Sequence, residues 1–469
     1  MLNSIKWLYF IELFPKLLST LSILIAAKFI PPSEYGLASY FLIYCGYFRA
    51  ILETTASKIV LQAEININNT IQQNHLNSVI FSLGLLFSPF PLILIAIFSP
   101  EKIESTKLFI SLLLICLTIP LGSLNSIAIA KLSKNLDFQR IFIAQCIGAL
   151  ASTFCLGILL ILEKSFFPVI FSNFINILSL SLYLFTTKRL DAPPLGSLFT
   201  DAKLKIDFLI FNTWHFFESK LNWLSSWLDA LIIALLLTSN DLGVFRMGSA
   251  IPIMLFSSLV FPFSQFFASN LANSKTHAKS TKCNILNAQN TILELSLLIV
   301  IGCYIFGDTF VLIFGNQWTG IQHIIVGISL SMSISYISSC YTDFYRINGR
   351  SKLATQIQLV KIFYHAPAYY FLLTFNLKFF LIGKTLLSII DQLLEFKIQK
   401  EIINISAYDF YQVKINILVR YILILALIMV FDTFMEDQPL HKYYYITPIY
   451  LLYSFNIFHR NMKMKKNQF

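Results

Sequence analysis

Long runs of apolar residues, separated by short polar segments, follow one another along almost the whole chain. A run of about 20 apolar residues is long enough to cross the hydrocarbon core of a bilayer as an α-helix. The pattern predicts about fourteen such helices, at residues 7–29, 37–61, 77–99, 107–130, 141–162, 165–187, 207–237, 244–271, 284–306, 318–341, 354–375, 377–396, 414–433 and 443–459. We therefore expect an all-α polytopic membrane protein.

Two stretches, Trp7–Gly36 and Trp214–Gly243, share one design: a spanning helix with ionisable residues, then a turn with an acid just before a glycine. Six predicted helices fit within the offset between the two glycines. Parallel repeats of this kind are typical of transporters. The pattern predicts two six-helix lobes of the same orientation, a linker, and two additional helices with a basic tail. The expected boundaries are 1–187, 188–206, 207–396 and 397–469.

Composition and charge agree with a membrane protein. The chain is 56% hydrophobic and 13% charged, whereas a soluble protein has roughly 25% charged residues. The net charge of +11 does not come from a basic domain, so we expect no nucleic-acid partner. With the N-terminus in the cytoplasm, 21 Lys and Arg residues fall in cytoplasmic segments and 5 in outer ones. This bias predicts that both termini are cytoplasmic. The seven cysteines form no metal-binding motif.

Charged residues inside spanning helices are expensive and indicate a functional site by default. The basic candidates for substrate binding are Lys16, Arg49, Lys220 and Arg246, and the acidic candidates for charge balance or ion coupling are Glu12, Glu53, Glu218 and Asp229. A line of cations suits an anion, because Arg binds phosphate through two donors and Lys acts as a point charge. The simpler interpretation stays open: these residues form ion pairs within helices that only stabilise the bundle. The charges at 343–395 are expected to be interfacial or to stabilise their lobe.

The segment AAKFIPPSEYG at 26–36 and its counterpart NDLGVF at 240–245 resemble polysaccharide flippases of the multidrug/oligosaccharidyl-lipid/polysaccharide exporter superfamily. The bacterial O-antigen and polysaccharide-repeat flippases are the nearest branch. The resemblance implies two lobes around a cationic cavity. It also implies a polyprenyl-diphosphate-linked glycan, moved from the inner to the outer leaflet of the bacterial cytoplasmic (inner) membrane. Basic residues on helices 1, 2, 7 and 8 of that family correspond here to the four cations named above, although Lys16 stands where Arg is frequent.

We also expect one of the acidic residues to bind a coupling H⁺ or Na⁺, and we expect other polysaccharide assembly proteins as partners. Three other functions are possible for a protein of this kind. A multidrug or cation antiporter of the same superfamily usually has an acidic cavity and twelve helices. A membrane-embedded polysaccharide polymerase or ligase would carry a long outer loop, and the predicted outer loops are short. A purely structural scaffold has no use for paired charged stripes. We expect a transporter and not an enzyme, with no catalytic residue, no cofactor and no metal site.

Overall fold

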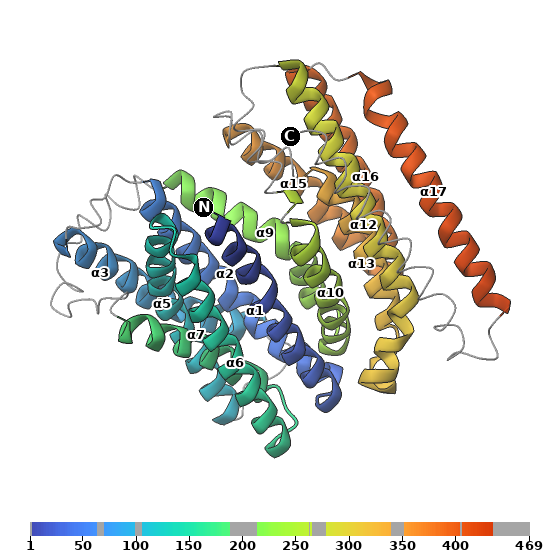
Figure 1. The fold of residues 1–469 in the computed structure, drawn as a ribbon. Helices are drawn as coiled ribbons and strands as arrows, with labels where there is room; N and C mark the ends of the chain where they lie inside the picture. The colour runs from blue at the N-terminus through green and yellow to red at the C-terminus, as the bar shows by residue number, and fades with distance from the viewer. Residues whose placement is uncertain are drawn as a thin grey trace. The chain divides into compact units, whose positions relative to one another are not determined.

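The computed structural model is helical almost throughout the part of the chain that it describes, and no strand occurs there (Figure 1). It describes residues 2–62, 70–98, 106–187, 213–261, 263–264, 278–338, 351–403 and 406–434. The helices are α1 (Leu2–Phe29), α2 (Pro32–Gln62), α3 (Thr70–Phe87), α4 (Pro89–Phe98), α5 (Thr106–Lys134), α6 (Phe138–Leu162), α7 (Phe167–Thr186), α9 (Thr213–Leu236), α10 (Ser239–Leu259), α12 (Ala278–Phe314), α13 (Ile321–Ser335), α15 (Ser351–Phe375), α16 (Leu377–Ile403) and α17 (Ala407–Phe434). Short 3₁₀ turns lie at Asn316–Trp318 and Tyr336–Ser338. The predicted all-α fold is confirmed.

Each predicted run as far as 414–433 coincides with one or two of these helices. The predicted linker 188–206 and the last predicted helix, 443–459, lie outside the described residues. The predicted single helix at 77–99 is two helices, α3 and α4, which meet at Pro89. Proline has no backbone N–H and its ring clashes with the preceding turn, so a helix tends to end or kink there. The hydroxyl of Ser88 donates to the carbonyl oxygen of Leu85 (2.7 Å) and satisfies one acceptor at that end.

The connections between helices follow from local chemistry. Gly315 and Gly320, in the turn between α12 and α13, have φ values of +100° and +88°, a backbone region that glycine enters without a steric penalty. Between α15 and α16 the side chain of Asn376 accepts a hydrogen bond from the backbone N–H of Phe379 (2.9 Å). An Asn cap of this kind satisfies one of the free donors at a helix start, which allows a one-residue turn here.

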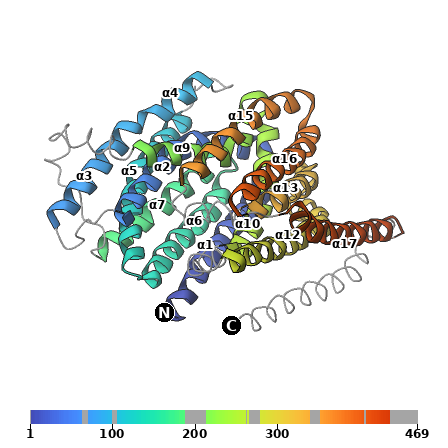
Figure 2. The same ribbon diagram turned by 90° about the horizontal axis from the view of Figure 1, so that it is seen from above.

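The helices group into two compact units. The first contains α1 to α9, α10 as far as Met247, and residues 358–366 of α15. Within it α2 packs against α5 and α9, α1 packs against α6, and α6 packs against α7 (Figures 1 and 2). The second unit contains the remainder, in which α13 packs against both α12 and α16, and α17 packs against α12. The predicted six-helix lobes stay a prediction.

Helices α2 and α10 cross at their N-terminal ends, and the two glycines aligned in the sequence repeat lie at the crossing. A Cβ added to Gly36 would overlap the backbone carbonyl of Ser239, and one added to Gly243 would overlap the carbonyl of Pro32. Small residues allow two helix backbones to approach this closely. The contact is reciprocal: Pro32 and Ser239 each stand four positions before the glycine of their own helix. This symmetry supports the proposed alignment of the repeat.

Five helical stretches in the described residues are long and apolar enough to cross a membrane. They are Lys107–Lys134, Phe138–Leu162, Phe167–Thr186, Ser239–Leu259 and Ile285–Phe314. Many large apolar side chains are exposed, among them Phe154 (73%), Ile161 (77%) and Phe363 (81%). In water such a surface would be unusual, whereas lipid tails cover it naturally. The chain is a multi-pass membrane protein.

Candidate functional site

Arg49, on α2, lies at the centre of the most completely described part of the site. Its Nε bonds to Oε1 of Glu53, one turn further along α2, at 3.2 Å. Its Nη1 donates a longer bond to Oδ1 of Asn173 on α7 (3.4 Å). A guanidinium group has five N–H donors in a fixed plane, and these two contacts use only two of them. With 30% of its side chain exposed, Arg49 keeps donors on Nη2 for a further acceptor.

Gly122, on α5, provides the space in which this ion pair lies. A Cβ at Gly122 would lie 3.0 Å from Cδ of Arg49 and would overlap the carboxylate of Glu53. Real Cβ atoms are rarely found so close to a neighbour, so any side chain at this position would move the pair. Helices α2, α5 and α7 together therefore fix the direction of the Arg49 guanidinium group.

Arg246, in the second turn of α10, is held by α9 and α2. Its Cζ lies 4.2 Å from the ring centroid of Trp227, within the range of a cation–π contact. Asp229 on α9 and Tyr35 on α2 interact with it electrostatically. The ring of Trp227 and the charge of Asp229 together hold the Arg246 guanidinium group close to α9.

Aromatic side chains connect the surroundings of Arg246 to α2. Trp227 stacks on Trp223, with ring centroids 6.0 Å apart and an interplanar angle of 13°, and Trp223 makes an edge contact with Tyr47 at 4.9 Å. The sequence analysis did not single out these three residues. The available signal was the spacing of Trp223 and Trp227, one helical turn apart and on the same face as Lys220.

The other predicted residues are described less completely. Lys16 and Lys220 lie half-buried on α1 and α9. The carbonyl of Lys16 accepts bonds from the hydroxyls of Ser19 and Thr20, each at 2.8 Å. The side chains of Glu12 and Glu218 lie outside the described part of the structure. The structure thus brings Arg49 together with Glu53, and Arg246 together with Asp229. That the four cations bind one substrate stays a prediction.

A second polar cluster lies in the other unit, where the sequence predicted interfacial or lobe-stabilising charges. Asp391 and Glu395 on α16 are 6% and 2% exposed, so the interfacial interpretation is wrong for these two. Elsewhere in this unit, between α12 and α17, Glu294 lies 3.6 Å from Nη2 of Arg420, and Lys414 donates to Oε1 of Gln289 at 2.6 Å. Hydrogen bonds and ion pairs in a low-dielectric interior hold helices together strongly. The lobe-stabilising interpretation therefore remains.

A family model for polysaccharide biosynthesis proteins matches residues 25–323, which is more than half of the chain and includes Arg49, Glu53, Asn173 and Arg246 but not Glu12 or Lys16. The chain belongs to this family. A sequence search with this chain found no match among curated proteins.

Solved structures resemble this member of the polysaccharide biosynthesis proteins in fold over most of its length. The lipid II flippase MurJ, in an inward closed conformation, matches with a TM-score of 0.71 and 15% identity, over 96% of this chain and 98% of MurJ. An inward-facing multidrug-resistance MATE transporter of the MOP superfamily matches with a TM-score of 0.65 and 12% identity, over 84% and 96%. A MOP-superfamily transporter from Pyrococcus furiosus, described as having a binding pocket of reversed polarity, matches with a TM-score of 0.56 and 14% identity, over 86% and 95%. The fold is that of MOP-superfamily transporters. These neighbours are transporters and a flippase, not enzymes.

Proposed function

We propose that this protein is a flippase for a lipid-diphosphate-linked oligosaccharide, the repeat unit of a surface polysaccharide such as an O-antigen. It moves its substrate from the inner to the outer leaflet of the bacterial cytoplasmic membrane by alternating access. The observation that supports this most directly is the geometry of Arg49. Its guanidinium group is oriented by Glu53 and Asn173 and keeps donors on Nη2, which is the arrangement that binds an oxyanion.

In this proposal the diphosphate binds Arg49 and Lys16, with Lys220 and Arg246 as further cationic contacts. A phosphate oxygen on Nη2 shares the charge of the guanidinium group with Glu53 on Nε, so substrate binding weakens the pairing of Arg49 with the carboxylate. The acids Glu12, Glu53, Glu218 and Asp229 balance the cations when the site is empty. One of them takes up the coupling H⁺ or Na⁺ when the substrate leaves. The lipid tail stays in the bilayer while the two predicted lobes rock around the site.

Two findings support this proposal. One is the family to which the chain belongs, and the other is the pocket described for a protein of the same fold. Membership in a polysaccharide biosynthesis family favours a glycan substrate over a drug. Within the same fold, the Pyrococcus furiosus transporter is described as having a pocket whose reversed polarity suggests a different function. We infer that the basic character of Arg49, Lys220 and Arg246 selects an anionic substrate here, in the way an acidic cavity selects a cation. Both termini lie in the cytoplasm in this proposal, as the charge bias predicts.

The proposal is tested by replacing Arg49 with Ala in cells that make the polysaccharide. We expect loss of surface polysaccharide and accumulation of the lipid-linked repeat unit, because the remaining cations lack the oriented donor. The matched control is Arg140→Ala. Arg140 is also paired with a carboxylate, Nη1 to Oδ2 of Asp137 at 3.0 Å, but its side chain is 45% exposed at the start of α6. Surface polysaccharide at the normal level in Arg49→Ala cells, with the variant present in the membrane, would rule out this assignment.

A further inference from the structure

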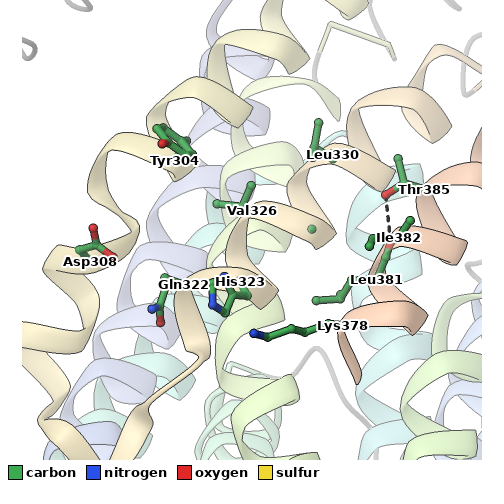
Figure 3. A pocket seen from close by; sticks show the side chains of 11 residues that line it. Tyr304, Asp308, Gln322, His323, Val326, Leu330, Lys378, Leu381, Ile382 and Thr385 are labelled. Atoms are coloured by element: carbon green, nitrogen blue, oxygen red, sulfur yellow. Dashed lines mark hydrogen bonds between the residues drawn. The ribbon is translucent and has the colours of Figure 1, made fainter. Parts of the chain in front are cut away.

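The second unit contains a pocket whose lining includes none of the residues assigned to the glycan (Figure 3). Its volume is about 500 Å³, within the range of about 300–1,000 Å³ that is typical of small-molecule sites. Three helices line it: α12, α13 and α16. Its lining combines charged or polar residues with apolar ones: Tyr304, Asp308, Gln322, His323, Val326, Gly327, Leu330, Lys378, Leu381, Ile382 and Thr385.

The basic residues of the lining lie at one end of the pocket. Gln322 and His323 are in the first turn of α13, and Lys378 is in the first turn of α16. Leu330 and Thr385 each lie seven residues further along their helices, which is roughly 10 Å deeper at about 1.5 Å per residue. Figure 3 shows the Lys378 side chain extending toward His323 and Gln322, with Leu330 and Thr385 at the other end. The charged groups therefore lie at the helix ends, Val326 and Ile382 lie about one turn deeper, and Tyr304, Leu330 and Thr385 line the far end.

The polar end offers groups of both signs. Lys378 and His323 are exposed donors, and the helix dipoles add partial positive charge at the starts of α13 and α16. Asp308 on α12 is an exposed acceptor on the same pocket. The side-chain oxygen of Gln322 is buried and has no hydrogen-bond partner among the described residues. A buried acceptor in this state costs free energy until a donor reaches it. The site therefore suits a ligand that carries an anionic group beside a hydrogen-bond donor.

Large apolar side chains of α16 are exposed beside the pocket. Ile382 in the lining is 61% exposed, and its neighbours Phe379 and Leu386 are 55% and 56% exposed. Helix ends in a membrane protein lie at the level of the lipid headgroups. The pocket thus places its charges at headgroup level and its apolar wall at the level of the first chain carbons.

We propose that this pocket binds a phospholipid whose headgroup carries a phosphate and a primary ammonium group, of the phosphatidylethanolamine type. The phosphate contacts Lys378, His323 and the start of α13. The ammonium group donates to Asp308. The first part of one acyl chain lies against Val326, Leu330 and Ile382. Under the predicted orientation this end of the unit is on the outer side, so the lipid belongs to the outer leaflet.

The test is native mass spectrometry of the purified, delipidated full-length protein in detergent, titrated with phosphatidylethanolamine or phosphatidylglycerol. We expect one retained phosphatidylethanolamine molecule, and about tenfold weaker binding in Lys378→Gln. Asp308→Asn should weaken phosphatidylethanolamine binding and remove the preference over phosphatidylglycerol. The matched control is Lys352→Gln, because Lys352 is an exposed lysine in the first turn of α15, outside the pocket lining. It should bind like the parent.

A second variant tests the apolar wall without changing charge. Val326→Trp fills the lower part of the pocket and should prevent lipid retention while size-exclusion behaviour stays unchanged. The proposal is overturned if Lys378→Gln and Lys352→Gln bind equally well, or if both lipids bind the parent equally. It is also overturned if millimolar inorganic phosphate binds in place of the lipid, since the site would then recognise a free anion.

Discussion

At the scale of single residues, the candidate site depends on how Arg49 is oriented, and less on the number of cations. The spacing of Arg49 and Glu53 was enough to predict their pairing from the sequence, because residues four apart face each other on a helix. The parts supplied by other helices, Asn173 and Gly122, could not be predicted in this way. Neither residue is charged, and each lies too far from Arg49 in the sequence to be linked to it by helix spacing.

The space at Gly122 gives a sharp test of this orientation. In Gly122→Ala the new methyl group would displace Arg49 and Glu53, with a packing cost of about 1–3 kcal/mol. We expect the rate of glycan transport to fall at least about fivefold while the protein still folds. Gly157→Ala on α6 is the control, because a Cβ there meets no atom within 4 Å. Equal transport by the two variants would show that the position of the Arg49–Glu53 ion pair does not affect the rate of transport.

A second residue-scale prediction concerns Glu163, in the connection between α6 and α7. The hydrogen bond from Lys107 (2.8 Å), helped by one from Ser165 (2.7 Å), lowers the pKa of Glu163 below its usual value. A carboxyl with a lowered folded-state pKa stabilises the protein above its unfolded pKa of about 4.3, and this contribution disappears as the pH falls through the folded value. Glu163→Gln should therefore melt at a lower temperature than the parent at pH 7.

The difference in melting temperature between the parent and Glu163→Gln should shrink as the pH falls from about 5 to 3. Thermal unfolding in detergent over this pH range measures it. A constant difference would mean that the ionised carboxylate contributes nothing. Lys107→Gln should reproduce the loss at pH 7, since it removes the first of the two donors.

At the scale of helices, the apolar runs predicted the elements well because a bilayer demands about 20 apolar residues in each span. The break at Pro89 was missed, since apolarity continues through it even though the helix does not. The crossing of α2 and α10 was anticipated only as an alignment of Gly36 with Gly243. Their direct contact depends on the three-dimensional path of two helices far apart in the sequence.

The close approach of α2 and α10 leads to a prediction about how fast a reagent in solution reaches a cysteine near the start of α2. Gly36→Ala places a methyl group against the carbonyl of Ser239, and Gly243→Ala places one against the carbonyl of Pro32. Both changes should separate the two helix ends to a similar extent. Ser39, one turn along α2, is 6% exposed. A Ser39→Cys reporter should therefore react several times faster with a membrane-impermeant maleimide in either glycine variant. Unchanged labelling in both, with Gly157→Ala as reference, would show that the close approach is not needed to cover this segment.

At the scale of the whole molecule, hydropathy and charge bias predicted a polytopic protein, and the structure and its fold neighbours agree. Those neighbours include a lipid II flippase and multidrug transporters, so the fold alone does not select a substrate. Our proposal of an anionic glycan substrate rests on the basic residues of the first unit and on the match to the polysaccharide biosynthesis family. The buried acids Asp391 and Glu395 of the second unit show why sequence alone assigns charges poorly. Position along a helix does not reveal which face the neighbouring helices cover.

The central claim is that the chain itself moves a lipid-diphosphate-linked glycan across a bilayer. The most direct measurement uses the purified protein in liposomes whose inner leaflet carries such a lipid with a biotin label on the glycan. Appearance of the label outside is followed by avidin binding. We expect transfer at least about tenfold faster than in liposomes with Arg49→Ala, and parent-like transfer with Arg140→Ala. Equal transfer by the parent protein and Arg49→Ala, or no transfer above protein-free liposomes, would contradict the account.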